Sequence, residues 1–454
     1  MSGGGHPLAS WAEAQAYYVA LRARAQRSFA AGEGGCSLPP DVLREAWLAG
    51  RLGSEGQTLH HGAVQVPDFG LPGAPGEPDV VHAELLVGGR RVVGSVVFHA
   101  EAEDWERCGC GTDARFDDVV LHVVAQEPPP GWFTRTSAER EVPVMPLQAE
   151  LLQAACALPR RRESGAARGA TGALAELPRE TLETLLQAAA AHRAALKRER
   201  FRSRVSVVGV EQAWYEAWAQ TLGYGANAAT MQMLARRVPL ADLRGAGADA
   251  AVARLLGAAG FLVPVLPQRA TEEERAYHRR VWDGWWRCRE CYATRPLPWR
   301  LGAVRPMSHP HRRVAALACS AVLPGLWEQL ADAAQWEFAE HRLAALRDDF
   351  WDVHCSLSAP ALHRRCRLVG AATLQAFRVN HLLLYHEGVD TWGQFLAQRA
   401  DSVPGLLRRT ACAWLGEARV RAGGDCAELL RRCYAQQGFL QLCTDFEELP
   451  PDSL

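Results

Sequence analysis

Hydrophobic and polar positions change their period along this 454-residue chain. From about residue 62 to 124 the apolar residues follow the two-residue period of β-strands, and Gly88-Gly89 between two such runs is a tight-turn signal. The pattern predicts a hairpin with strands over 81–87 and 90–99. A nearly continuous apolar run over 118–124 predicts a further strand that is buried on both faces.

Helical periods lie on both sides of this region. Residues 11–31 and 40–52 are predicted helices, and nearly everything after Leu177 has the helical period. The low-complexity run over 160–172 is typical of a linker or surface loop. We therefore predict an α+β protein with an N-terminal helix and Gly-rich break over 1–36, a mixed α/β domain with a small sheet over 37–157, a linker or surface loop over 158–176, and a mainly α-helical C-terminal domain over 177–454.

Composition narrows the class of protein. Hydrophobic residues make up 48% and charged residues 22%, which excludes a mostly disordered chain or a collagen-like repeat. The formal net charge of -1 gives no whole-protein attraction to nucleic acid or to acidic membranes, so such binding needs a local basic patch. Scattered cysteines and a start without a signal-peptide pattern predict a cytoplasmic protein, and no apolar run is long enough to cross a membrane.

Basic residues concentrate in two segments. Lys197 is the single lysine and lies in an arginine-rich helical run over 193–204, and a second segment follows Trp299. Arginine forks suit phosphate groups, and neighbouring aromatic rings can stack on bases, although such runs are more often solvated helix faces. The candidate nucleic-acid contacts are Lys197, Arg198, Arg200, Arg305, Arg312 and Arg313.

The predicted hairpin brings an acid and an imidazole to its open end. Paired residue numbers sum to 177 across the Gly-Gly turn, so Asp79 falls opposite Phe98, between Val97 and His99. This is the layout of a PD-(D/E)xK nuclease core, in which two carboxylates bind Mg²⁺ and a lysine orients the attacking water. Asp79 and His99 are therefore the candidate catalytic residues. The alternative is that Asp79 caps a loop and His99 is an ordinary strand-end histidine.

The same region also fits a transition-metal site. The candidate ligands are His99, Cys108 and Cys110, with Asp113 or His122 as the fourth. Imidazole and thiolate are both standard zinc ligands, so the cofactor question stays open between Zn²⁺ and Mg²⁺. The alternative is that the two cysteines are small residues in a tight turn and that His122 is a hydrogen-bonded core histidine.

Six segments, in a fixed order, carry a resemblance to a known family. They are 77–83 (EPDVVHA), 94–99 (GSVVFH), 104–110 (DWERCGC), 116–124 (FDDVVLHVV), 222–227 (LGYGAN) and 305–313 (RPMSHPHRR). Together they resemble the bacterial domain-of-unknown-function 2851 family, whose name implies no activity. Where that family has a glutamate, two histidines and an asparagine, this chain has Val97, Cys108, Cys110 and Ser308. The change at Val97 removes one expected metal ligand.

From these patterns we expect a nucleic-acid-associated protein with a degenerate PD-(D/E)xK-like or metal-binding pocket and without intact nuclease activity. A restriction-endonuclease-like core is one form that the small sheet could take. Two alternatives stay open. One is a non-catalytic scaffold that binds a protein partner through its arginine-rich helical surface, and the other is a zinc-dependent hydrolase of a small molecule.

Overall fold

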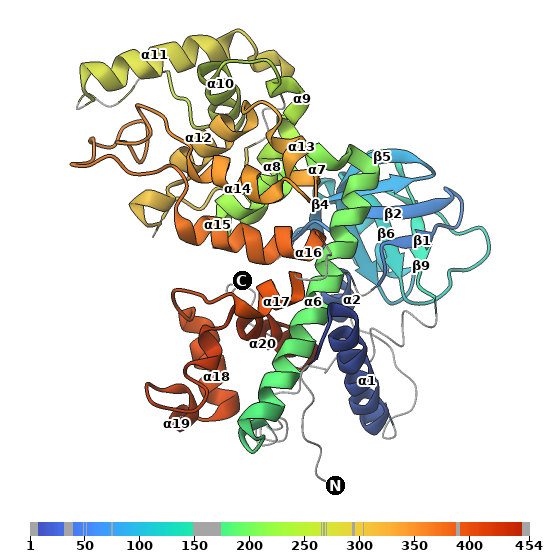
Figure 1. Ribbon diagram of the computed structural model, residues 1–454. Helices are drawn as coiled ribbons and strands as arrows, with labels where there is room; N and C mark the ends of the chain where they lie inside the picture. The colour runs from blue at the N-terminus through green and yellow to red at the C-terminus, as the bar shows by residue number, and fades with distance from the viewer. Residues whose placement is uncertain are drawn as a thin grey trace. The chain divides into compact units, whose positions relative to one another are not determined.

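The computed structural model describes residues 8–30, 40–48, 50, 52–73, 76–148, 174–264, 266, 268, 270–292, 296–302, 304–386 and 391–446. These residues group into two compact units, one formed by 1–207 with 395–453 and the other by 208–394. The first contains a mixed sheet and the second is helical (Figure 1), which confirms the α+β class. The predicted linker falls mostly on 149–173, outside the described residues, and the predicted domain ranges stay predictions.

The sheet of the first unit has seven strands in the order β1-β2-β4-β5-β6-β9, with β3 paired to β4. Strands β5, β6 and β9 run parallel, and the other pairs are antiparallel. The strands are β1 (Glu55–Gln57), β2 (Ala63–Asp68), β3 (Leu71–Pro72), β4 (Val80–Val87), β5 (Arg90–His99), β6 (Val119–Val124) and β9 (Val144–Pro146), while β7 (Thr134–Arg135) and β8 (Glu141–Val142) form a separate antiparallel pair.

Strands β4 and β5 form the predicted hairpin across Gly88-Gly89. Both glycines have positive φ, 55° and 80°, as a tight two-residue turn requires. His82 (φ 58°) lies in a β-bulge that shifts the pairing by one residue. Beyond the bulge Val80 pairs with Val96, so the constant sum predicted from the turn is wrong at the open end of the hairpin.

Both faces of the sheet are covered. On one face Trp47 of α2 (Pro40–Leu48) packs edge-on against Phe69 and Phe98, in a core that also contains Leu121 and Val123 of β6. The other face carries a second apolar cluster around Trp105 of α3 (Asp104–Arg107), which lies in the connection from β5 to β6. The predicted burial of β6 on both faces is thus confirmed.

The remaining helices of the first unit surround α6 (Arg179–Val208). Arg204 of α6 forms a buried ion pair with Glu84 of β4 at 2.6 Å, so this helix is fixed to the sheet. Tyr18 of α1 donates a hydrogen bond to Asp445 of the last helix at 2.7 Å. The helices are α1 (Trp11–Ala30), α17 (Thr391–Ala397), α18 (Gly405–Leu415), α19 (Glu417–Val420) and α20 (Cys433–Phe446).

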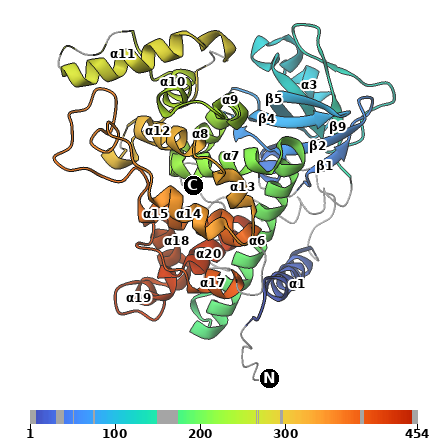
Figure 2. The ribbon, with the colours of Figure 1, turned by 45° about the horizontal axis from the view of Figure 1, so that its top comes forward.

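The second unit is built around α12 (Pro310–Ala321), whose residues are almost all buried. Helix α10 (Ala248–Ala258) packs on α12 and on α11 (Glu272–Trp286), as Figure 2 shows. None of the helices in the described part of the chain has the length and hydropathy that crossing a bilayer needs. The other helices are α7 (Val210–Gly223), α8 (Ala228–Arg237), α9 (Leu240–Leu243), α13 (Leu326–Ala331), α14 (Trp336–Ala344), α15 (Ala371–Phe377) and α16 (Leu383–Tyr385).

Candidate functional site

Two histidines meet at the carboxyl ends of the parallel strands β5 and β6. His99 is the last residue of β5, and His122 of β6 pairs with Val97, two residues before His99. Nδ1 of His99 is 2.9 Å from Nε2 of His122, and Nδ1 of His122 is 3.1 Å from Oγ1 of Thr134 in β7. Carboxyl ends of parallel strands are common ligand sites in α/β sheets. The three side chains form one continuous hydrogen-bonded chain.

Burial keeps this chain uncharged. His122 is fully buried, and burial together with the nearby His99 lowers the pKa of His122 to about 3. Burial also lowers the pKa of His99, partly offset by Asp104. Each neutral imidazole has one N–H, so His122 donates either toward His99 or toward Thr134. The two arrangements leave Nε2 of His99 with a proton in the first and a lone pair in the second.

The candidate acid Asp79 stays at the open end of the hairpin. Its Oδ2 accepts a hydrogen bond from the backbone N–H of Phe98 at 2.9 Å, despite the shifted register. The neighbouring Val97 is 2% exposed and packs in the apolar cluster with Trp105 and Cys110. The position where a PD-(D/E)xK site has its second carboxylate is therefore part of the hydrophobic core.

The predicted zinc ligands are distributed rather than grouped. Cys110 is buried, and burial with the nearby Cys108 raises the pKa of its thiol to about 12. Cys108 is exposed. Asp113 accepts a hydrogen bond from the backbone N–H of Arg115 at 2.9 Å and pairs with its guanidinium.

One ring nitrogen of His99 and one of His122 are occupied by the hydrogen bond that joins the two side chains. Within the described part of the chain, no three His, Cys, Asp or Glu side chains come together to hold a metal. The structure therefore gives the zinc and magnesium predictions no support.

The basic candidates of α6 are directed into the first unit. Lys197 Nζ donates to Oε1 of Gln437 in α20 at 3.0 Å, and Arg193 Nε donates to the same oxygen at 3.2 Å. Burial, with Arg193 and Arg200 nearby, lowers the pKa of Lys197 well below its usual range. Arg198 lies over the ring of Trp11, with its guanidinium carbon 5.7 Å from the ring centroid. Lys197 and Arg198 thus contact other residues of the first unit.

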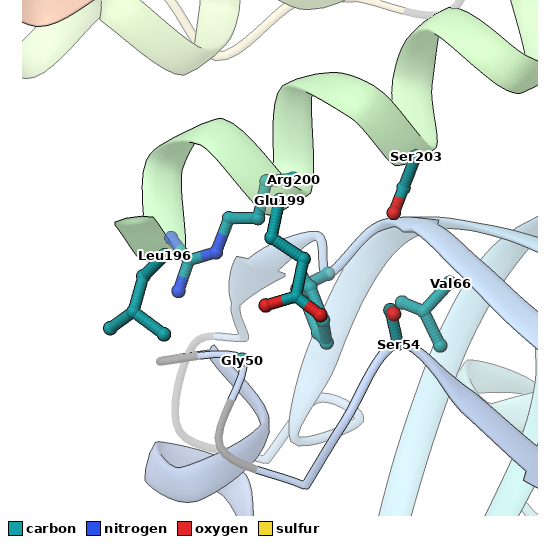
Figure 3. A pocket seen from close by; sticks show the side chains of 8 residues that line it. Gly50, Ser54, Val66, Leu196, Glu199, Arg200 and Ser203 are labelled. Carbon is teal, nitrogen blue, oxygen red and sulfur yellow. The ribbon is translucent and has the colours of Figure 1, made fainter. Parts of the chain in front are cut away.

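Arg200 belongs to a small pocket between α6 and β2 (Figure 3). Its guanidinium lies over Phe69, 5.6 Å from the ring centroid. It also lies against Gly50, where an added Cβ would be 2.9 Å from Nη2. The pocket encloses about 290 Å³, part of it open to solvent, and Glu199 also lines it. Because Glu199 supplies negative charge beside Arg200, the pocket does not select for anions.

The second basic segment is divided between interior and surface. Arg312 is fully buried and donates to the backbone carbonyls of His354, Cys366 and Arg367 at 2.9–3.1 Å. Arg313 is also buried, and Arg305 is exposed. Of these three candidates, Arg305 lies at the surface, and Arg312 acts as a structural cross-link.

Strand β7 contributes residues that the sequence interpretation missed. Thr134 is fully buried against His122, whereas Phe133 on its other side is 54% exposed. The guanidinium carbon of Arg135 lies 4.8 Å from the centroid of the Phe133 ring. The backbone carbonyl of Arg135 accepts a hydrogen bond from the indole of Trp105 at 2.8 Å. The sequence signal for these residues was the alternation that follows 128–131, in which small polar residues alternate with aromatic or basic ones.

Comparisons with known proteins agree with the resemblance described from the sequence. No curated protein and no solved structure matches this chain. A family model described as a protein of unknown function, DUF2851, matches residues 41–387, which is most of the chain. The chain therefore belongs to the DUF2851 family.

Proposed function

We propose that this protein associates with single-stranded nucleic acid through the outer face of β7 and does not cleave it. The observation that carries the proposal is the exposed pair of Phe133, just before β7, and Arg135 of β7, which flank the inward residue Thr134 that completes the histidine chain. A base stacked on an aromatic ring contributes about 1–3 kcal/mol, and arginine adds attraction to the phosphate backbone.

Further exposed arginines lie on the connection between β5 and β6. Arg107 and Arg115 have side chains 64% and 62% exposed, and they pair with acids whose side chains are 18–44% exposed. Surface ion pairs of this kind contribute only about 0–1 kcal/mol. A phosphate group can therefore replace these carboxylates at small cost.

We propose the absence of cleavage because of residues in the interior of the same region. Mg²⁺-dependent phosphodiester cleavage of the PD-(D/E)xK type needs two carboxylates, and here Val97 occupies the second position inside an apolar cluster. Asp79 is held by the backbone of Phe98. The histidine chain then serves to fix β7 against the sheet.

The two alternatives gain less support. A scaffold that uses the arginine-rich helical surface would need basic side chains that point outward, and Lys197 and Arg200 of α6 lie against other parts of the first unit. A zinc hydrolase would need a cluster of ligands, and the described residues contain no such cluster.

The test is fluorescence anisotropy of labelled single-stranded DNA and RNA, with duplex DNA for comparison, over a salt series. We expect binding that weakens as salt rises, and Phe133→Ala should weaken it about 10- to 100-fold, the loss of one stacked base. Phe338→Ala is the matched control, because Phe338 is 58% exposed in the second unit. Equal loss in both variants, or no binding by the unmodified protein at low salt, would reject the proposal.

A further inference from the structure

A buried arginine of the second unit has no counter-charge. Arg313 of α12 is 8% exposed. Its Nη1 donates to Oγ1 of Thr373 at 3.1 Å and its Nη2 to Oγ of Ser308 at 3.4 Å. Nε of Arg313 has no hydrogen-bond partner, and the described residues place no carboxylate within ion-pair distance of this side chain. A buried cation without a counter-ion is unfavourable unless something else neutralises it.

Other arginines of this unit show how such a charge is normally accommodated. Arg236, which is partly buried, pairs with the buried Glu216 at 3.0 Å. Arg312, the neighbour of Arg313, places its guanidinium among three backbone carbonyls. Arg313 has two neutral hydroxyl groups instead, and burial together with Arg312 lowers its pKa only to about 10, so it stays charged at neutral pH.

Two hydroxyl groups lie beside the guanidinium of Arg313. Ser308 and Thr373 accept hydrogen bonds from it, so the O–H group of each remains available to donate to another acceptor. The contact with Ser308 brings the guanidinium to the N-terminal end of α12, which begins at Pro310. That end of a helix of this length carries partial positive charge and favours anions.

A second segment is tied to the one that carries Arg313 and Ser308. Asn227 donates to the carbonyl of Arg300 at 2.9 Å and accepts from its N–H at 2.8 Å, which ties the region of 222–227 to the chain that leads into 305–313. Tyr224 is 71% exposed and has φ 37°, a conformation that is strained for a non-glycine residue. The charge of the Tyr224 phenol opposes the lowering of the Arg313 pKa.

We propose that Arg313, Ser308 and Thr373 form a binding site for a phosphate group. The guanidinium has more N–H groups than Ser308 and Thr373 accept, and each hydroxyl keeps an O–H to donate, which suits a tetrahedral oxyanion with several acceptor oxygens. The anion neutralises Arg313. This site lies in the second unit and does not depend on the proposed role of β7.

The experiment measures thermal unfolding and calorimetric binding of the full chain with inorganic phosphate, against chloride at equal ionic strength. We expect a melting temperature that rises with phosphate concentration, because a ligand that binds only the folded state stabilises it. Acetate at equal ionic strength distinguishes a general carboxylate site, which would stabilise as much as phosphate and overturn the phosphate assignment.

Arg313→Met should reduce phosphate affinity about 10- to 100-fold, the loss of a charge-assisted hydrogen-bonding group. Without phosphate the variant should melt at or above the temperature of the unmodified protein, because an uncompensated charge is removed. Ser308→Ala, which keeps the cation, tests the site if Arg313→Met fails to fold, and should lower affinity several-fold. Arg408→Met is the matched control, since Arg408 is exposed, and should leave phosphate binding unchanged. Absence of phosphate binding by the unmodified protein, or equal binding by Arg313→Met, would overturn the inference.

Discussion

Basic residues of the first unit lie in two regions with opposite surroundings. On α6, Arg204 forms a buried ion pair with Glu84, and Lys197 bonds to Gln437. On β7, Arg135 is exposed and lies over Phe133, and its ion pair with Glu139 at 3.3 Å is on the surface. The comparison teaches that the α6 cations hold the fold together, whereas the β7 arginine remains able to meet a ligand.

The largest expected effect comes from breaking the interior charge pairing. Glu84 is 1% exposed and pairs with both Arg204 and Arg91 at 2.6 Å. Glu84→Ala leaves the buried Arg204 without this counter-charge and should lower the free energy of unfolding by about 3–5 kcal/mol. Urea denaturation measures this loss. A loss below about 1 kcal/mol would show that α6 is not fixed to the sheet through this pair.

The next prediction concerns the interior of the candidate site. Val97→Glu places a carboxylate in the apolar cluster with Trp105, and should destabilise the protein by about 3 kcal/mol. Urea denaturation with and without MgCl₂ measures the effect, with Val97→Ala as the control for lost packing. If Mg²⁺ restored the stability of Val97→Glu and this variant cleaved DNA, the unmodified site would be shown to lack only this one metal ligand.

The histidine chain predicts a pH dependence of stability. The pKa of His122 is about 3 in the folded protein and about 6.5 in the unfolded chain, so the unfolded state binds more protons between these values. Stability therefore falls as pH decreases from about 6.5 toward 3, by about 1.4 kcal/mol per pH unit for this one group. His122→Gln should make the slope shallower by that amount in urea denaturation between pH 4 and 6. An unchanged slope would place His122 in contact with solvent.

The smallest effect on stability is expected at the outer face of β7. Arg135→Gln should change the free energy of unfolding by less than about 0.5 kcal/mol, because its ion pair and its stacked ring are exposed. The same variant should weaken binding of single-stranded nucleic acid severalfold and reduce its salt dependence by about one phosphate contact. A stability loss as large as that of Glu84→Ala would place Arg135 among the structural arginines.

The sequence predicted the parts of the fold that depend on local pattern. The Gly88-Gly89 turn identified the hairpin, and the apolar run over 118–124 identified the buried strand β6. The constant register placed Asp79 opposite Phe98, whereas the structure joins them beyond the register shift through a side-chain hydrogen bond. The bulge at His82 was not anticipated, because a single residue with positive φ leaves no mark in the hydrophobic period.

The surroundings of individual side chains could not be predicted in the same way. Charged residues on α6 look alike in sequence, and only a distant residue, Gln437, shows that Lys197 points inward. His122 is held by Thr134 of a two-residue strand, too short to give a period. Burial of Arg312 depends on carbonyl groups from a segment far along the chain. Long-range packing decides these roles.

Binding and cleavage can be followed in a single assay. A single-stranded oligonucleotide labelled at one end is incubated with the protein and Mg²⁺, and its anisotropy and length are followed together. We expect raised anisotropy that Phe133→Ala removes, with the oligonucleotide intact throughout. Unchanged anisotropy at low salt, or shortening of the oligonucleotide, would contradict this expectation.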